Sequence, residues 1–397
     1  MKRILFLPLL GLCAIGAAPA PKHWVPGWDA PPIGYEPKIK EGLGRPFNNE
    51  TVRQEIYSRI SGSTIRIRLS NELSDAAMRI GAATIMRLDA AGKPVSGSLR
   101  TLTFSNARDV LVPAHAPMLS DPLKFPVKAG ERFAVSIFFP EETAPPAHAQ
   151  MVDVAAGNVS DKVELPGSTR ARASGVVSAL EITGAPATNV VVTFGDSITE
   201  GAGASRAMSW PDQLARLLSA DPKSQCWAVS NAGISGNRLW SSGRGPNGLS
   251  RFDRDVLSVP GATHVVILEG INDIGKVRNP ADWQPPAEKL IAAYEQLLAR
   301  AKSRGLKVIF GTLLPYKGAA YADDAGEQRR ATVNSWMRAN RARFDGLIDF
   351  DTAMGEPGDP ATMRLSWQIG DHLHPNDAGY TTMAKTAFPV IRAQGCR

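Results

Sequence analysis

The sequence has few of the residues that build metal centres. Its 397 residues include three cysteines and six histidines. The histidines, at positions 23, 115, 148, 264, 372 and 374, form no H-E-x-x-H motif, and no cysteine cluster accompanies them. Zinc sites use such closely spaced ligands, so a metal-dependent deacetylase is a weak interpretation. We expect the protein to need no metal and no other cofactor.

Long hydrophobic runs are also lacking, except at the N-terminus. Lys2 and Arg3 precede an apolar run from Ile4 to Ala18 that only Pro8 interrupts, and small residues follow. This layout is typical of a secretory signal, and the run is shorter than the roughly 20 residues that span a bilayer. We expect residues 1–20 to be a signal peptide, with its cleavage point left open. The mature protein is then secreted or periplasmic, without a membrane anchor.

No charge of one sign dominates the chain. Lys and Arg number 45 against 38 Asp and Glu, a formal charge of +7. The densest basic stretch lies in a helix-like segment and consists of Arg329, Arg330, Arg338, Arg341 and Arg343. We interpret it as a solvated helix face and expect no nucleic-acid partner, because no recognised fold or aromatic interleaving accompanies it. The sequence leaves the oligomeric state open.

Two cysteines, Cys226 and Cys396, remain after removal of the predicted signal. An exported chain enters a compartment where disulfides can form. The wide separation of the two cysteines in sequence gives no information about their distance in the fold. A disulfide and two buried free thiols are therefore both open interpretations.

The length favours two folded domains, and the hydrophobic pattern changes once along the chain. From about residue 60 to 182, short apolar alternations are separated by Gly, Pro, Asn and Asp. Residues 65–69 alternate Ile, Arg, Ile, Arg and Leu, and residues 133–139 repeat this period of two. The pattern is typical of strands with one buried and one wet face. We expect residues 21–185 to form an all-β sandwich.

After Gly184-Ala185-Pro186, apolar β-branched runs alternate with helical stretches, which indicates an α/β domain. The apolar runs lie at residues 190–194, 226–229, 265–268, 308–310 and 347–350. Residues 287–304 repeat apolar side chains at helical spacing. Each gap is long enough for a crossover helix, so we expect residues 186–397 to form a parallel sheet covered on both faces.

Polar segments follow the strands of this predicted sheet. The first strand leads into Gly195-Asp-Ser-Ile-Thr-Glu-Gly201, the second into residues 231–237 (NAGISGN), and the third into Gly270-Ile-Asn-Asp273. Asp371-His-Leu-His-Pro375 precedes the final helix-like segment. Catalytic residues in such sheets gather at the carboxyl ends of the strands. Each segment alone could be an ordinary turn, but together they offer a hydroxyl, an imidazole, a carboxylate and oxyanion donors.

These four segments, in this order across about residues 189–391, resemble the sequence blocks of the SGNH (GDSL-type) serine hydrolases. The resemblance implies a flavodoxin-like three-layer fold and ester hydrolysis through an acyl-enzyme. It implies that Ser197 is the nucleophile, His374 its general base, and Asp371 the residue that orients His374. The α/β-hydrolase fold is a rival, but it requires G-x-S-x-G at the nucleophile, which the sequence around Ser197 does not have.

The resemblance further implies an oxyanion hole made of the backbone N–H groups of Ser197 and Gly236 and the side-chain amide of Asn272. Gly233 is the alternative glycine, which we expect instead to serve a tight turn.

Five other residues have expected roles near the site. His372 is a rival base, which the Asp-x-x-His spacing of the family disfavours. Asp196 and Asp273 are expected to bond backbone N–H groups at strand ends. Arg238 and Trp240 are expected to bind substrate, although a packed core aromatic is an equal interpretation for Trp240.

Residues 51–75 resemble the β-sandwich, of jelly-roll type, that precedes the SGNH domain in some two-domain secreted bacterial esterases. Several carbohydrate esterases have this layout, which implies acetyl removal from a carbohydrate ester. Two alternatives stay open. One is a general short-chain arylesterase or lipase, and the other is a catalytically inactive carbohydrate-binding protein.

Overall fold

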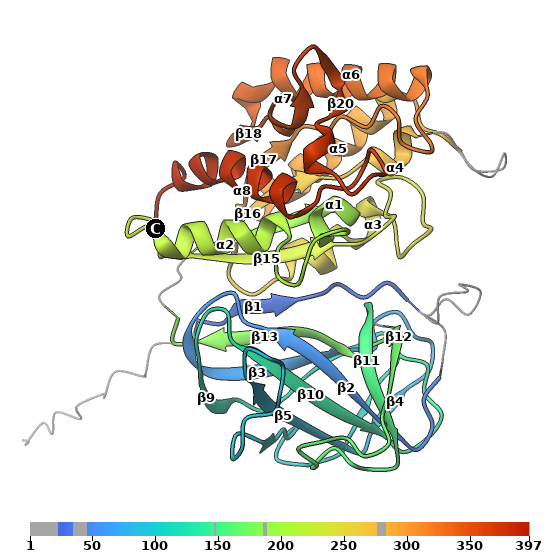
Figure 1. Ribbon diagram of the computed structural model, residues 1–397, viewed down its shortest axis with the longest axis vertical. Helices are drawn as coiled ribbons and strands as arrows, with labels where there is room; N and C mark the ends of the chain where they lie inside the picture. Colours follow the sequence, from blue (N-terminus) through green and yellow to red (C-terminus); the bar gives the residue numbers. More distant parts are fainter. Residues whose placement is uncertain (1–22, 35–45, 147, 186–188, 276–282, 397) are drawn as a thin grey trace, which may run out of the picture.

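The computed structural model describes residues 23–34, 46–146, 148–185, 189–275 and 283–396. The predicted signal peptide, residues 1–20, lies outside them. The described residues form a β-sandwich body and an α/β body that lie one above the other (Figure 1). Strand β13 (Val177–Thr183) ends the first body and β14 (Asn189–Gly195) begins the second, on either side of the expected boundary at residue 185.

The N-terminal body consists of two main antiparallel sheets. The first has the order β1-β13-β3-β8, with β9 also paired to β3: β1 (Val25–Asp29), β3 (Gly62–Ser70), β8 (Pro117–Leu119) and β9 (Leu123–Val127). The second has the order β12-β11-β2-β10-β5-β6: β2 (Glu50–Tyr57), β5 (Ala82–Leu88), β6 (Arg100–Thr101), β10 (Arg132–Phe139), β11 (Ala149–Ala156) and β12 (Thr169–Ser174). A short pair joins β4 (Met78–Ile80) to β7 (Val110–Val112). The predicted β-sandwich is confirmed.

The second body is built on a parallel sheet with the order β15-β14-β16-β17-β18. Its strands besides β14 are β15 (Trp227–Gly233), β16 (Ala262–Leu268), β17 (Lys307–Gly311) and β18 (Gly346–Ile348). All five fall on the predicted apolar runs, and the order is the flavodoxin-like one. Central strands are buried on both faces, so an almost continuous apolar run identifies them in the sequence.

Helices cover both faces of this sheet (Figure 1). On one face α2 (Trp210–Ala220) packs against α8 (Asp377–Arg392). On the other, α5 (Ala287–Ser303) packs against α3 (Gly248–Phe252) and α6 (Asp324–Ala339). Shorter elements are α1 (Ser197–Glu200), α4 (Ile271–Ile274), α7 (Phe350–Met354) and a hairpin of β19 (Gly355–Glu356) and β20 (Asp359–Met363). None of the helices described in the structure has the length and apolar character needed to cross a membrane.

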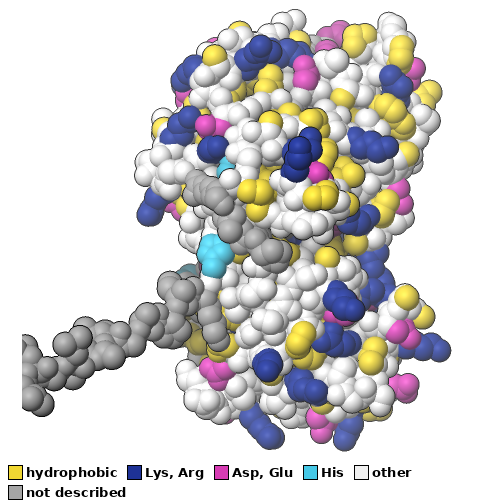
Figure 2. Space-filling model, turned by 90° about the vertical axis from the view of Figure 1, so that its left-hand side faces the viewer, with side chains coloured by type: hydrophobic (Ala, Val, Ile, Leu, Met, Phe, Trp, Pro, Cys, Tyr) yellow, Lys and Arg dark blue, Asp and Glu magenta, His cyan; other side chains and the backbone are white. Residues whose placement is uncertain are grey.

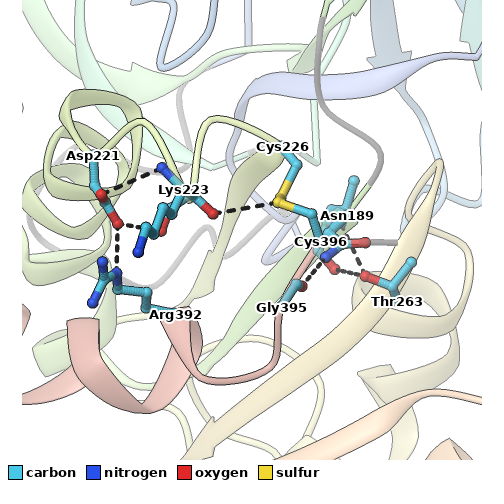
Figure 3. The surroundings of a disulfide bond; sticks show 10 residues. Asn189, Asp221, Lys223, Cys226, Thr263, Arg392, Gly395 and Cys396 are labelled. Atoms are coloured by element: carbon cyan, nitrogen blue, oxygen red, sulfur yellow. Dashed lines mark hydrogen bonds and ion pairs between the residues drawn. A yellow bond between two sulfur atoms is a disulfide. The ribbon is translucent and has the colours of Figure 1, made fainter.

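Cys226 and Cys396, whose pairing the sequence left undecided, form a disulfide. The Sγ atoms of Cys226 and Cys396 are 2.04 Å apart. The bond joins the residue before β15 to the segment after α8, as Figure 3 shows. Beside it, the side-chain amide of Asn189 donates to the carbonyl of Gly395 at 2.8 Å. The disulfide therefore closes the α/β body at the edge from which its strands begin.

The two bodies meet where β1 packs against the edge strand β15. The guanidinium of Arg59 bonds Asp29 at 3.0 Å on its own side and Asp212 of α2 at 2.7 Å across the interface. Tyr57 Oη also donates to Asp212, at 2.8 Å. Asp29 accepts from the backbone N–H of Asn231 at 2.8 Å. Buried polar contacts between named partners therefore fix how the bodies lie against each other.

The expected wet face of β3 is half-buried rather than fully exposed. Arg66 and Arg68 were expected to face water, yet Arg66 pairs with Glu181 at 2.5 Å, and the Glu181 side chain is almost fully buried. Arg68 and Glu181 also line a small cavity of about 60 Å³ that residues of both bodies enclose. The alternation correctly predicted the strand, but the α/β body covers part of its polar face.

The space-filling view shows that the molecule narrows where the bodies meet and that basic and acidic side chains are interspersed on the surface in view (Figure 2).

Candidate active site

The polar segments predicted from the sequence gather at one end of the parallel sheet. Ser197 follows β14, Gly236 follows β15 and Asn272 follows β16, while Asp371 and His374 lie in the segment before α8. All five line one cavity of about 770 Å³. The cavity lies at the carboxyl ends of the strands, beside β14, whose two neighbours β15 and β16 lie on opposite sides of it. Ligands usually bind at this position in such folds.

Three side chains form a continuous hydrogen-bonded chain. Ser197 Oγ lies 2.8 Å from His374 Nε2, and His374 Nδ1 lies 2.6 Å from Asp371 Oδ2. The other carboxylate oxygen of Asp371 accepts the backbone N–H groups of His374 at 2.9 Å and of Leu373 at 3.0 Å. With the proton on Nδ1 held by Asp371, Nε2 is free to accept the hydroxyl proton of Ser197.

The charge of Asp371 is maintained by these contacts. Partial burial disfavours its ionised form, but the hydrogen bonds from His374 and Leu373 outweigh burial and hold its pKa below the ordinary value. Asp371 therefore stays a carboxylate wherever His374 can act as a base, and it can stabilise the imidazolium that forms when Ser197 loses its proton.

Ser197 is the first residue of helix α1. Asp196 caps this helix, since its carboxylate accepts the N–H of Ile198 at 2.9 Å. A Cβ on Gly195 would lie 2.2 Å from the carbonyl oxygen of Leu268, so only glycine allows β14 to approach β16 here. Burial raises the pKa of Asp196 to about 7. The predicted structural role of Asp196 is confirmed.

Asn272 presents its amide to the cavity beside Ser197. Its Nδ2 donates to the carbonyl of Asn237 at 2.9 Å, and Tyr321 Oη donates to its Oδ1 at 3.4 Å. Because an amide nitrogen has two hydrogens, one remains for a ligand after the bond to Asn237. These partners fix which end of the amide faces the cavity, and Tyr321 had no signal in the sequence.

Gly233 and Gly236, at and after the end of β15, have different conformations from those expected. Gly236 has a φ of 74°, lines the cavity and makes the tight turn. Gly233 ends β15, and a Cβ there would lie 2.1 Å from the backbone nitrogen of Glu200. The expectation that Gly233 serves a tight turn is therefore wrong. Gly233 is needed because the helix that carries Ser197 packs directly on its Cα.

A buried arginine lies beneath the catalytic segments. Arg251 donates to the carbonyl of Gly195 at 2.8 Å, to the carbonyl of Ala232 at 2.8 Å and to Asn237 Oδ1 at 2.8 Å. It also bonds Glu269 Oε2 at 3.3 Å, and the side chains of both residues are fully buried. Arg251 thus connects the segment that leads to Ser197 with the one that carries Gly236. Sequence reasoning missed it, because its partners lie up to 56 residues away.

Asp273 has the predicted structural role. Its carboxylate accepts the N–H groups of Leu239 at 2.7 Å and Trp240 at 3.1 Å, while burial raises its pKa to about 6. His372 has a φ of 59° and packs against Gly318, whereas His374 bonds Ser197 Oγ. The structure therefore does not place His372 as the base.

The two expected substrate-binding residues differ in position. Arg238 lines the cavity, as expected. Trp240 does not, because its indole Nε1 donates to the carbonyl of Lys289 at 2.9 Å and its ring stands edge-to-face on Trp283. The substrate-binding expectation for Trp240 is corrected in favour of a packed aromatic.

The cavity has polar and apolar lining residues and draws on both bodies. Its lining consists of Arg172, Ser197, Ala202, Ser235, Gly236, Arg238, Arg244, Asn272, Gly275, Ala319, Ala320, Tyr321, Asp371, Leu373 and His374. Arg172 comes from the sandwich strand β12, and nothing in its local sequence indicated a place in the site. The apolar residues are mostly small.

A serine hydrogen-bonded to a histidine, which is in turn hydrogen-bonded to a carboxylate, at the carboxyl end of a parallel sheet defines the serine hydrolase class. Residues 193–382 match the family model described as GDSL-like lipase/acylhydrolase. The chain therefore contains a domain of this family and is a carboxylic ester hydrolase. Comparison with curated proteins gave no match.

Solved structures with a similar fold carry related descriptions. A protein assigned to the lipolytic G-D-S-L family from Desulfitobacterium hafniense is 23% identical, with a TM-score of 0.40, and the match covers 51% of this chain and 98% of that one. A lipase/acylhydrolase from Enterococcus faecalis is 22% identical, with a TM-score of 0.39 and coverage of 52% and 97%. The family assignment rests on the match over residues 193–382.

Proposed function

We propose that this chain is an exported serine esterase that uses Ser197, His374 and Asp371 to remove acetyl groups from a carbohydrate substrate. The observation that carries the catalytic part is the unbroken hydrogen-bonded chain from Ser197 to Asp371, which opens into a cavity with Asn272 and Gly236. In this mechanism Ser197 Oγ attacks the ester carbonyl and its proton passes to His374 Nε2.

The remaining steps follow from the same groups. The oxyanion that develops on the carbonyl oxygen accepts hydrogen bonds from the N–H groups of Ser197 and Gly236 and from the amide of Asn272. His374 then gives its proton to the leaving alcohol as the C–O bond breaks. Water attacks the acyl-enzyme with His374 again as base, which releases the acid and restores Ser197.

Lining chemistry and size support the carbohydrate part. Arginine, serine and tyrosine side chains offer several hydrogen-bond donors at the site, and hydroxyl-rich substrates accept such bonds. Ala202, Ala319 and Ala320 provide only short apolar surfaces, which suit an acetyl group better than a long acyl chain. The volume of about 770 Å³ leaves room for a sugar on the alcohol side.

Two features support export. The N-terminal residues have the composition of a secretory signal, and Cys226 and Cys396 form a disulfide, which persists in oxidising compartments. Export and the hydrogen-bonding side chains of the cavity together favour an extracellular or periplasmic glycan ester over a cytosolic metabolite.

The test measures kcat/KM for acetyl, butyryl, octanoyl and palmitoyl aryl esters, together with acetate release from acetylated xylan, pectin and oligosaccharides. The wild type is compared with Ser197→Ala, which should lose essentially all activity. We expect the acetyl ester to be the best aryl ester and at least one glycan to release acetate. Specificity that rises steadily to octanoyl, by up to about 0.8 kcal/mol for each methylene, without acetate release would replace this proposal with the lipase alternative.

A further inference from the structure

One histidine of the sandwich body lies between the two bodies with both ring nitrogens engaged. His148 precedes β11 and is 9% exposed. Its Nδ1 lies 2.9 Å from the carbonyl oxygen of Pro31, and its Nε2 lies 3.1 Å from Glu200 Oε1. A carbonyl and a carboxylate can only accept hydrogen bonds. Both nitrogens must therefore carry a proton to satisfy both contacts, so the geometry requires an imidazolium.

The charges around His148 favour this state. Burial lowers its pKa, but the carboxylate of Glu200 and the Pro31 carbonyl outweigh burial, and Arg172 of β12 opposes them weakly, so that the net shift is upward. For Glu200, burial raises the pKa, yet His148 and the bonds from Ser235 lower it to about 2. The two groups thus form a partly buried ion pair between the bodies.

Glu200 connects this pair to the catalytic residues. It ends helix α1, which begins at Ser197. Its second carboxylate oxygen accepts the backbone N–H of Ser235, the residue directly before Gly236. One carboxylate therefore bridges a sandwich histidine and the segment that carries an expected oxyanion donor.

The same segment is tightly packed against α1. Asn231 Nδ2 donates to the carbonyl of Thr199 at 2.9 Å, and Gly233 leaves no space for a Cβ against Glu200. A movement of Glu200 therefore changes the position of Ser235 and Gly236 relative to Ser197. Small displacements of an oxyanion donor reduce catalysis strongly, because the donor must meet the charge that develops on the carbonyl oxygen.

We propose that His148 is a positioning residue for ester hydrolysis, through which the sandwich body holds Glu200 and thereby the Gly236 N–H at the oxyanion position. This inference rests on the proposed function of Ser197. It gives the sandwich a part in turnover that does not depend on sugar binding. It also makes turnover sensitive to alkaline pH, because the ion pair is lost when His148 gives up a proton, while Glu200 keeps its negative charge.

The direction of the pH effect follows from the shift. The pKa of His148 is raised in the folded protein, so its contribution is complete below the ordinary histidine range and is lost as the pH rises through the raised value. The charged groups that face it are Glu200 of α1 and Arg172 of β12. Wild-type kcat should therefore fall on the alkaline side.

The test measures kcat and KM across pH, with an acetyl aryl ester, for the wild type, His148→Ala and His148→Gln. We expect kcat to fall about tenfold in His148→Ala, with little change in KM and without the alkaline decrease. His148→Gln should recover part of kcat, because its amide can still donate to Glu200, and its profile should also be flat on the alkaline side.

Tyr57→Phe is the matched control, since Tyr57 bonds Asp212 in the same interface without contacting Glu200. It should keep the kcat and pH profile of the wild type. A kcat decrease in Tyr57→Phe as large as that in His148→Ala would reduce the effect to general loosening of the interface and overturn the proposal. So would folded His148 variants with wild-type kcat and an unchanged alkaline limb.

A double variant keeps the test decisive if His148→Ala folds poorly. Combining His148→Gln with Glu200→Gln should lower kcat no further than Glu200→Gln alone, because both act through one contact. Additive losses would contradict the proposal. Failure of the proposed function is distinguishable, because Ser197→Ala would then retain activity, whereas failure of this inference alone leaves Ser197→Ala inactive.

Discussion

The two bodies of this protein contribute to one site in different ways. The α/β body carries Ser197, Asn272, Asp371 and His374 in segments that follow β14 and β16 or precede α8, and each of these segments has a short sequence motif. The sandwich body contributes Arg172 to the cavity and His148 to an ion pair behind it, and both reach the site only through the way the bodies pack. Function assigned from motifs alone therefore describes one body and leaves the other without a role.

The largest expected effect tests the α/β side. Asn272→Ala should lower kcat by roughly a hundredfold or more, because it removes one oxyanion donor, with KM nearly unchanged. Steady-state kinetics on an acetyl aryl ester measure this, and circular dichroism checks the fold. Tyr321→Phe is a milder companion, since it removes the bond to Asn272 Oδ1 and leaves Asn272 in place, and its kcat should lie between those of the wild type and Asn272→Ala. Raised KM with unchanged kcat would mean that Asn272 only binds substrate.

Removal of the disulfide should affect the stability of the two bodies differently. Replacing Cys226 and Cys396 by Ala should destabilise the α/β body by about 2–4 kcal/mol, while the sandwich, which contains neither residue, keeps its stability. Calorimetry should show a lower Tm for one transition, and activity at 25 °C should persist because the bond lies away from the cavity. Equal lowering of both transitions would show that the bodies unfold as one unit.

The smallest expected effect tests the sandwich side of the cavity. Arg172→Ala should raise KM for acetylated oligosaccharides severalfold and leave kcat for a small aryl acetate unchanged, because Arg172 lines the cavity without contacting Ser197. Arg170→Ala is the matched control, since Arg170 is on the same strand and pairs with Asp153 instead. Equal KM values for Arg172→Ala and the wild type on every glycan would confine recognition to the α/β body.

Prediction from the sequence succeeded where the physical cause is local. The parallel strands were found because burial on both faces demands continuous apolar runs, and Asp196 because a strand end followed by a helix needs a cap. The polar face of β3 is only partly wet, because alternation reveals a polar face but not what packs against it. Gly233 was misread because glycine serves turns and close approaches alike.

Contacts between distant residues gave no signal. Arg251 and Glu269 look like ordinary surface charges until the fold places both beneath the catalytic segments. His148 lies 52 positions from Glu200, and no spacing rule joins them. The disulfide was undecidable for the same reason, since Cys226 and Cys396 are 170 positions apart.

The bond from Asn189 to Gly395 has a consequence for how this domain can be rearranged. It brings the entry to the first strand beside the segment that follows the last helix, as Figure 3 shows, at the edge from which the strands begin. Ends that lie this close together are favourable for circular permutation, in which they are linked and new ends are made elsewhere. The exposed turn at Gly305 is a suitable place for the new ends. A permuted α/β domain would keep every catalytic segment intact while moving its attachment to the sandwich, which makes the covalent link between the bodies separable from their packing.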